Sequence, residues 1–362
     1  MKQRNLKVFL PVLLALLLFA VDKIALLPWF QQCCTFSGSS HFFSHAMNYS
    51  FTQDEMIDRA RQEGRHISMN FGSSRSLPYY LSPTPGQIER SEYLDREQKD
   101  RARQWEVVNS AFPGSSIMTA YVRLTQWLEH GAQPEVVFIE ISPVGLTSRT
   151  LWFPTELKFG VPLRFALEHI GEMPWEHVRT IIGSRVFALS RFRIGSSSVD
   201  FSFFDKLVSE TNQHVNHRPE NVDVMQGTQV GSESGQELGY YVLVVQNSTP
   251  VMLKNYQIDP VLEEYVYLII NECKQRNIPV VFWVPPTHPL WQHALRQYVP
   301  AQTWQRMMNQ IERRGGYVLD LSKSSELRCQ RFIDPVHFGQ GCVPEVFAHK
   351  IKFYEQNVKP NL

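Results

Sequence analysis

The sequence predicts an α/β fold with a doubly wound parallel sheet, preceded by a transmembrane helix and interrupted by a large, mainly helical insertion. Short apolar segments alternate with helical patterns after residue 105 and again after residue 260, and the segment over 136–141 is apolar enough to be buried on both faces. Polar residues of potential catalytic use follow the ends of these segments. With 362 residues, of which 43% are hydrophobic, the chain is long enough to bury such a core.

The expected strands and helices follow one another in an order that fits a parallel sheet. The first strand begins at His66 and stops at Gly72, where the sequence turns to small hydroxyl residues. The later elements are a strand over 105–109, a helix over 115–129, a strand over 136–141, a helix over 260–275, a strand over 278–284, a helical region up to 314 and a strand over 317–321. Ligands of such sheets bind beyond the carboxyl ends of the strands, so we expect the functional site there.

Residues 145–257 interrupt this alternation. They contain an aromatic-rich, mainly helical region up to residue 204, a polar stretch over 210–237 and a strand-like segment over 240–245. We expect this insertion to cap the site or to contact a partner. The domain that contains it is expected to cover residues 66–357.

The N-terminal sequence predicts a membrane anchor. Three basic residues, Lys2, Arg4 and Lys7, precede an apolar run that is interrupted only by Asp22 and Lys23 and continues to residue 30. About 20 apolar residues are enough to cross a bilayer. A cleavable signal peptide is the rival interpretation, but the run lacks a small-residue cleavage site.

The distribution of basic residues predicts which side of the membrane the domain occupies. Lys and Arg are lacking between residues 23 and 59, so the positive-inside rule leaves the N-terminus in the cytoplasm. In a bacterium, residues 1–30 would then cross the inner membrane once, residues 31–65 would form a membrane-proximal neck, and the C-terminal domain would lie in the periplasm. Asp22 and Lys23 would either snorkel to the outer interface or make a polar contact with another membrane protein.

Charge and cysteine content restrict the remaining function classes. A formal net charge of +1 gives no electrostatic reason to expect binding to nucleic acid. The histidines and cysteines lack zinc-site spacing and no phosphate-binding glycine loop is present, so neither a metal nor a cofactor is predicted. Cys329 and Cys342 bracket an Asp-Pro-Val-His segment, and a disulfide between them would hold that segment in place in an oxidising compartment.

Two short motifs carry the chemistry that the sequence suggests. Gly72-Ser73-Ser74 ends the first strand, where a serine either caps the following helix or acts as a nucleophile among converging backbone N–H groups. Asp334 precedes His337 by three residues, so the carboxylate can accept a hydrogen bond from Nδ1 and leave Nε2 to take a proton from a serine. Asp-x-x-His is also typical of a turn followed by a surface histidine.

These motifs, with Asn109-x-x-x-x-Gly114 between them, resemble the sequence blocks of the SGNH, or GDSL-like, hydrolase superfamily. The resemblance covers most of residues 66–357 apart from the insertion. It implies the flavodoxin-like SGNH fold and a catalytic triad of Ser74, Asp334 and His337.

The same resemblance implies an oxyanion hole and shows where this sequence departs from the family. Its donors would be the N–H groups of Ser74 and Gly114. Ser73 stands where the family has Asp, and the Gly-x-Asn-Asp block is missing at the strand that ends before Ser142. Ser142 is therefore the candidate for the third donor.

A Gly-Ser-Ser block, a predicted membrane helix and an outward-facing domain resemble a membrane-anchored subset of this superfamily. That subset acts with multi-span membrane-bound O-acyltransferases and includes the D-alanine transfer protein of teichoic acid modification and alginate O-acetyltransferases. The resemblance implies acyl transfer to or from a cell-envelope glycan through an acyl-serine, with a membrane-bound O-acyltransferase as partner. Two alternatives stay open: an envelope esterase or deacylase, and a catalytically inactive binding module.

Two further residues are candidates for substrate contact. His288 lies at a strand end and either contacts substrate or is an ordinary loop histidine. Arg75 follows the predicted nucleophile and either binds an anionic group of the substrate or is exposed to solvent.

Overall fold

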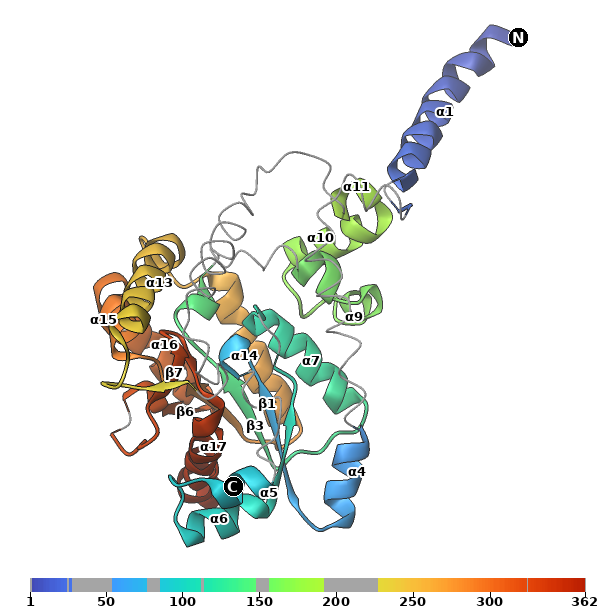
Figure 1. Ribbon diagram of the computed structural model, residues 1–362. Helices are drawn as coiled ribbons and strands as arrows, with labels where there is room; N and C mark the ends of the chain where they lie inside the picture. The colour runs from blue at the N-terminus through green and yellow to red at the C-terminus, as the bar shows by residue number, and fades with distance from the viewer. Residues whose placement is uncertain are drawn as a thin grey trace. The chain divides into compact units, whose positions relative to one another are not determined.

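A computed structural model describes residues 2–24, 26–27, 54–76, 85–111, 114–147, 156–191, 227–323 and 325–361 (Figure 1). The chain divides into two compact units. Unit 1 comprises Met1–Tyr49 and Pro154–Asn212, and unit 2 comprises Ser50–Phe153 and Gln213–Leu362. The predicted insertion thus contributes residues to both units. Most of the predicted neck, residues 31–53, lies outside the described residues.

Unit 2 is built on a five-stranded parallel sheet, as the sequence predicts. The strand order is β2-β1-β3-β5-β6, with β1 at His66–Phe71, β2 at Trp105–Asn109, β3 at Val136–Glu140, β5 at Val280–Val284 and β6 at Tyr317–Asp320. β1 pairs with both β2 and β3, so the order of the strands reverses beside β1. This arrangement is consistent with a doubly wound fold, in which ligands bind at such a switch point.

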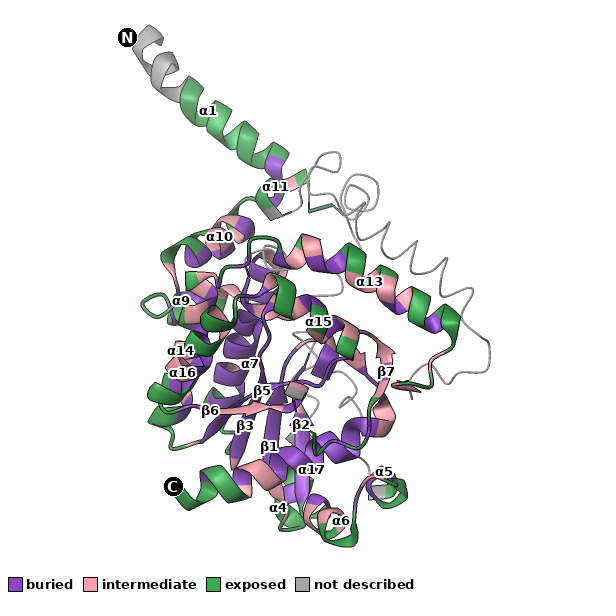
Figure 2. Cartoon of the chain, turned by 90° about the vertical axis from the view of Figure 1, so that its left-hand side faces the viewer, coloured by how far each residue is buried: buried purple, intermediate pink, exposed green. Residues whose placement is uncertain are grey.

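Helices cover the strands on both faces of the sheet, which is why the residues of β1, β2, β3 and β5 are almost all buried, whereas those of β6, at the edge, are partly buried (Figure 2). On one face, Phe138 and Trp283 pack in a common core with Phe347 of α17 (Val343–Phe353). That core also includes residues of α5 (Pro85–Arg90) and α6 (Arg96–Arg103). On the other face, three side chains lie close to Gly316. They are Phe282, Ile270 of α14 (Pro260–Gln275) and Ile311 of α16 (Ala301–Arg313). Alternate strand residues therefore serve two separate layers.

The remaining helices of unit 2 are α4 (Asp54–Gln62), α7 (Ile117–Glu129), α13 (Gly235–Leu253) and α15 (Pro289–Tyr298). α7 packs on α14, and α13 packs on α15. Single turns of 3-10 or π helix cover Val144–Leu146, Leu321–Lys323, Gln340–Cys342, Tyr354–Val358 and Lys359–Asn361. The helix predicted over 115–129 begins at Ile117, and the helix predicted over 260–275 has those limits.

The Asp-x-x-His segment, expected as a loop, is a small hairpin. β7 (Arg331–Asp334) pairs antiparallel with β8 (His337–Phe338), and β4 (Thr228–Gln229) pairs with the other edge of β7. Asp334 lies opposite His337 in this pairing. A single 3-10 turn connects the hairpin to α17, whose first turn contains Pro344, a position that proline favours.

The strand-like segment over 240–245 is helical, so the prediction of a strand there is wrong. It lies within α13, which begins with a capping box in which Ser234 and Glu237 bond to each other's backbone N–H groups. Tyr241 is buried against the hairpin and donates a hydrogen bond to the carbonyl of Phe332 at 2.8 Å. The cap and this packing override the strand preference of the aromatic and β-branched residues.

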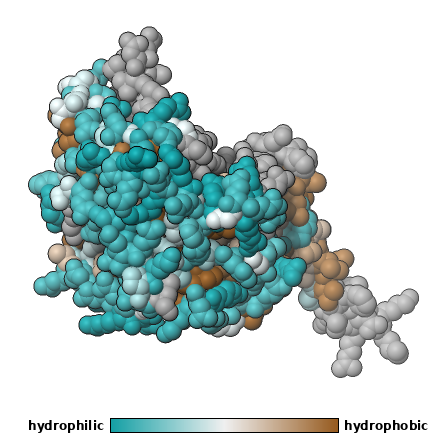
Figure 3. All heavy atoms as spheres, turned by 90° about the horizontal axis from the view of Figure 1, so that it is seen from below, coloured by the Kyte–Doolittle hydropathy of each residue, from teal (hydrophilic) through white to brown (hydrophobic). Residues whose placement is uncertain are grey.

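Unit 1 contains α1 (Lys2–Ile24), a π turn at Glu156–Gly160, α9 (Leu163–Glu168), α10 (Trp175–Val186) and α11 (Ala188–Arg191). Among the residues that the structure describes, no helix has the length and apolarity that a bilayer crossing requires, so the predicted transmembrane helix is not found there. The apolar side chains of α1 between Leu10 and Val21 are exposed and form a brown stretch in Figure 3.

Asp22 and Lys23 make contacts within the chain. The sequence predicted instead that they reach the outer interface or contact another membrane protein. The Asp22 carboxylate is buried and accepts hydrogen bonds from the backbone N–H groups of Ala188 and Leu189, at 2.7 and 2.8 Å. Lys23 pairs with Asp22 and donates to the carbonyl of Val186. The acidic residue thus caps α11 and joins it to the end of α1.

Candidate active site

Ser74, His337 and Asp334 form one continuous chain of hydrogen bonds. The Ser74 Oγ atom lies 2.8 Å from Nε2 of His337, and Nδ1 of the same ring lies 2.6 Å from Oδ2 of Asp334. Because the carboxylate can only accept, Nδ1 carries the proton and Nε2 is left to accept from the serine hydroxyl. The fold brings the three predicted residues together, although Ser74 and His337 lie 263 positions apart in the chain. Their arrangement is that of a serine nucleophile with its general base.

Asp334 is held so that its carboxylate faces the histidine. Its Oδ1 atom accepts hydrogen bonds from the N–H groups of Val336 and His337, at 2.8 and 3.0 Å, which close the hairpin turn. Burial alone would raise the pKa of Asp334, but the charge and hydrogen bond of His337 and these backbone donors lower it. Burial would conversely lower the pKa of His337, yet Asp334 raises it above its ordinary value. The pair therefore favours an imidazolium opposite a carboxylate, the state that forms when serine gives up its proton.

The turn that carries Ser74 is held from below by Glu140, at the end of β3. Oε2 accepts from the Ser73 N–H at 2.9 Å and from the Ser76 hydroxyl at 2.6 Å, while Oε1 accepts from the Ser73 hydroxyl at 2.6 Å. Burial would raise the pKa of Glu140, but Arg75 and the serine donors lower it, so the side chain is a carboxylate. Sequence reasoning missed this role, although an acidic residue closing an otherwise apolar, buried strand was a signal.

Arg75 faces the interior of the protein, so the interpretation that it is exposed to solvent is wrong. Its side chain is 10% exposed, and Nη2 lies 2.9 Å from Oε1 of Glu140. The same nitrogen donates to the Ser142 hydroxyl, which also accepts from the Gly145 N–H at 3.2 Å. The anionic group that Arg75 binds is therefore Glu140.

Gly72 is required here because of the space around it. A Cβ atom at this position would lie 2.4 Å from Oγ of Ser76 and 2.6 Å from Cβ and Oε2 of Glu140. Its φ angle lies outside the left-handed region, so lack of space for a Cβ atom, and not backbone conformation, is the reason for glycine. Residues 74–76 follow as one turn of 3-10 helix.

A small cavity of about 20 Å³ lies beside the Ser74 turn. Its lining includes Ser73, Arg75, Ser116, Glu140 and Ser142, but also apolar side chains such as that of Ile117. A cavity of this volume has room for roughly one water molecule.

The structure shows the backbone conformation of Gly114 and the contacts of Ser142, two of the three expected oxyanion donors. Gly114 has a φ of 73°, a backbone conformation that favours glycine, and it lies just before α7. Ser142 anchors Arg75 through its hydroxyl oxygen, and it lies beside Glu140 at the end of β3. Donation from Ser74, Gly114 or Ser142 to an oxyanion stays a prediction.

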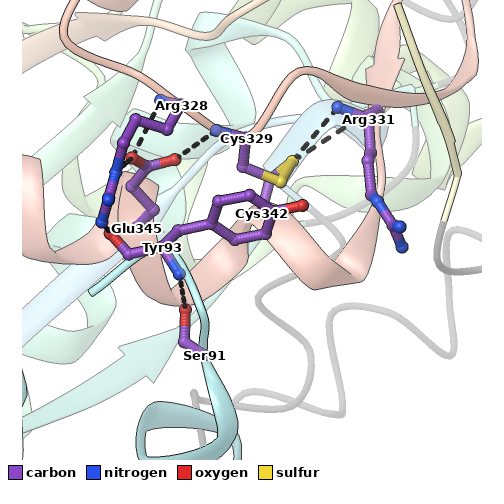
Figure 4. The surroundings of a disulfide bond; sticks show 7 residues. All are labelled: Ser91, Tyr93, Arg328, Cys329, Arg331, Cys342 and Glu345. Carbon is purple, nitrogen blue, oxygen red and sulfur yellow. Dashed lines mark hydrogen bonds and ion pairs between the residues drawn. A yellow bond between two sulfur atoms is a disulfide. The ribbon is translucent and has the colours of Figure 1, made fainter. Parts of the chain in front are cut away.

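A disulfide joins Cys329 to Cys342, so the hairpin that carries Asp334 and His337 is closed at its base (Figure 4). Glu345, at the start of α17, accepts hydrogen bonds from the N–H groups of Arg328 and Cys329 at 2.9 and 2.7 Å. Both strands of the hairpin are thus tied to the first turn of α17. The remaining described cysteine, Cys273, is buried and free.

His288 supports the same hairpin and is 4% exposed. Its ring Nδ1 accepts from the Leu290 N–H at 3.2 Å, and its ring Nε2 lies 2.9 Å from the Glu233 carboxylate. The backbone N–H of His288 donates to the Pro335 carbonyl at 3.0 Å. It is therefore a structural residue that caps α15 and holds the turn between β7 and β8.

The fold and site together define an α/β protein in which a Ser–His–Asp triad is assembled at the carboxyl end of a parallel strand. The chain belongs to the family described as "Protein of unknown function (DUF1574)", whose model matches residues 1–354. No curated protein matches the sequence.

Proposed function

We propose that the protein is a serine acyl-transfer enzyme in which Ser74 becomes transiently acylated. The observation that carries this proposal is the hydrogen-bonded chain from Ser74 through His337 to Asp334. A serine at its free pKa is a poor nucleophile, and a neutral imidazole at 2.8 Å is placed to remove its proton during attack.

The proposed reaction uses these residues in two half-reactions. Ser74 Oγ attacks the acyl carbonyl, its proton passes to Nε2 of His337, and Asp334 stabilises the resulting imidazolium. The imidazolium then protonates the leaving alcohol as the carbon–oxygen bond of the donor breaks. In the second half-reaction, His337 takes a proton from the acceptor hydroxyl, whose oxygen attacks the acyl carbonyl of the acyl-serine. The imidazolium then returns the proton to Oγ of Ser74 as the bond between Oγ and the acyl carbon breaks. The N–H groups of Ser74 and Gly114 would stabilise the oxyanion in both steps, with Ser142 as a third candidate.

We assign the protein, as part of this proposal, to the SGNH hydrolase superfamily and to the subset that modifies cell-envelope glycans. The sequence blocks at Ser74, Gly114 and His337 support this assignment. The partner would be a multi-span membrane-bound O-acyltransferase and the acceptor a glycan hydroxyl. An envelope esterase would use the same residues with water as acceptor, so the two functions differ only in the group that reaches the acyl-serine.

We further propose that the protein works at the outer face of a bacterial inner membrane. The apolar side chains of α1 support this location, because exposed leucines on all sides of one helix are costly in water. Protease added to spheroplasts should digest the domain while the N-terminal helix stays with the membrane fraction. Digestion that requires lysis of the spheroplasts would contradict the location without affecting the triad.

Labelling with a fluorophosphonate tests the catalytic proposal. Purified full-length protein should form a covalent adduct that peptide mapping places on Ser74. Ser74→Ala should abolish the adduct, and His337→Ala should slow its formation by a similar factor, because the nucleophile and base act as a unit. If folded wild-type protein takes no label at Ser74, the catalytic proposal fails and a binding module becomes the better interpretation.

A further inference from the structure

A lysine is buried beneath the Ser74 turn, in a position that the proposed reaction does not use. Lys350 lies on α17 and is 1% exposed. Its Nζ atom lies 4.1 Å from the ring centre of Trp283 and 4.5 Å from that of Phe138. Burial lowers the pKa of Lys350 well below its ordinary value, while the charge of Glu140 acts in the opposite direction. A methionine or leucine would fill such an apolar position at much lower cost, so the lysine calls for an explanation.

The lysine begins a directional series of hydrogen bonds that ends at the active site. Nζ donates to Oδ1 of Asn70 at 2.6 Å, and Nδ2 of Asn70 then donates to Oδ1 of Asn109 at 2.9 Å. Nδ2 of Asn109 donates in turn to the carbonyl of Ser76 at 3.3 Å. Oδ1 of Asn109 also accepts from the N–H of Ala111 at 3.1 Å.

This series connects two segments that the proposed reaction needs. Ser76 closes the turn that carries Ser74, and Ala111 follows β2 three positions before Gly114. Each asparagine amide has a donor end and an acceptor end, so the orientation of one amide determines the orientation of the next. A donor at Asn70 Oδ1 therefore turns Nδ2 of Asn70 toward Asn109, which matches the orientation of Asn109 that the Ser76 carbonyl and the Ala111 N–H require.

We propose that Lys350 is a positioning residue that holds Asn70 and Asn109 in this orientation and thereby ties the nucleophile turn at Ser76 to Ala111, three positions before Gly114. The inference rests on the proposed function, since it concerns the relative placement of the nucleophile and an expected oxyanion donor. Lys350 does not touch the reacting atoms and acts only through the two amides. The registers agree with this role, because Asn70 lies opposite Asn109 in the pairing of β1 with β2.

Lys350→Met is the variant that separates positioning from stability. Methionine has a similar length and no N–H group. It removes the burial cost of the amine but leaves Oδ1 of Asn70 without this donor, so two opposing effects act on stability. We expect the variant to fold with an unfolding midpoint near that of the wild type. Its maximal rate of fluorophosphonate labelling should fall about tenfold to a hundredfold, with little change in the concentration that gives half the maximal rate.

Two further variants determine whether the effect passes through the amides. Asn109→Ala should slow labelling by about the same factor as Lys350→Met, and the double variant should be no slower than either single one. Lys352→Met is the matched control, because Lys352 lies on the same helix but is 38% exposed and pairs with Glu326 at 3.2 Å. It should label at the wild-type rate. Wild-type labelling rates in both Lys350→Met and Asn109→Ala, or fully additive losses, would overturn the proposal.

A second readout does not depend on catalysis. In full-length protein labelled with ¹⁵N-asparagine, the side-chain amide resonances of Asn109 should shift in Lys350→Met and stay unchanged in Lys352→Met. If wild-type protein takes no label but these resonances shift, the proposed function fails while the positioning role of Lys350 stands. If wild-type protein labels normally and the Asn109 resonances of Lys350→Met coincide with those of the wild type, only the role of Lys350 is refuted.

Discussion

Replacing Glu140 by glutamine should test how the nucleophile turn is held. The carboxylate accepts hydrogen bonds from the Ser73 N–H, the Ser73 hydroxyl and the Ser76 hydroxyl, and it pairs with Arg75. Glutamine keeps the shape but offers one acceptor oxygen, and its NH₂ group would face donors that now meet an acceptor. Arg75, with a side chain only 10% exposed, would also lose its buried counter-charge.

The expected loss of stability follows from this burial. Removing one partner of a buried ion pair typically costs about 3–5 kcal/mol, because the remaining charge is left without compensation in the interior. We therefore expect Glu140→Gln to lower the free energy of unfolding by about that amount. The turn that it releases carries Ser74, so fluorophosphonate labelling should also slow at temperatures where the variant is folded.

Urea denaturation provides the measurement, and Glu97→Gln is the matched control. Glu97 pairs with Arg101 at 2.6 Å, a similar separation, but its side chain is 80% exposed. Exposed pairs of this kind contribute about 0.3–0.5 kcal/mol, so the control should unfold close to the wild type. If Glu140→Gln is no more destabilised than Glu97→Gln and labels at the wild-type rate, our account of the turn is wrong.

Three further predictions concern the glycine, the base and the disulfide. Gly72→Ala should lose about 1–3 kcal/mol of unfolding free energy through its clash with Ser76 and Glu140. Gly239→Ala, which meets no atom within 4 Å in α13, should be neutral or stabilising in the same urea titrations. Labelling needs neutral His337, so its rate should rise with pH through a pKa above 6.5. Asp334→Asn should move this rise to lower pH and reduce the plateau rate up to about 10⁴-fold. A rise that stays at the wild-type pH would contradict the pairing of His337 with Asp334. Replacing both Cys329 and Cys342 by alanine should cost about 3 kcal/mol in chemical unfolding, and two free thiols in non-reduced wild-type peptides would exclude the bridge.

The sequence was most informative where a residue's role depends on its immediate neighbours. Asp334 and His337 lie opposite each other across a two-residue turn, so their contact follows from their spacing along the chain. The five parallel strands were predictable for a similar reason, because each is a short apolar run between helical patterns. The prediction of a strand over 240–245 was wrong because it considered only the strand preference of these residues. The capping box at Ser234 starts a helix at Gly235, and this helix continues through 240–245.

Residues whose role depends on distant partners could not be assigned from the sequence. Glu140 closes a strand that the sequence predicts, but its role could not be predicted, since its partners lie 64–67 positions away. Lys350 falls on the buried stripe of α17, at the spacing of Val343, Val346 and Phe347, yet a lysine there is normally assumed to face solvent. Only the packing of α17 on β3 and β5 places its amine at Asn70 of β1.

The most direct test of the proposed reaction is the detection of an acyl-enzyme. Full-length protein treated with an activated acetyl ester and quenched in acid should gain the mass of one acetyl group, and peptide mapping should place it on Ser74. The adduct should be absent from Ser74→Ala and should form much more slowly in His337→Ala. An acetyl group found elsewhere, or formed equally fast in His337→Ala, would contradict the claim that the Ser74–His337–Asp334 chain activates the serine.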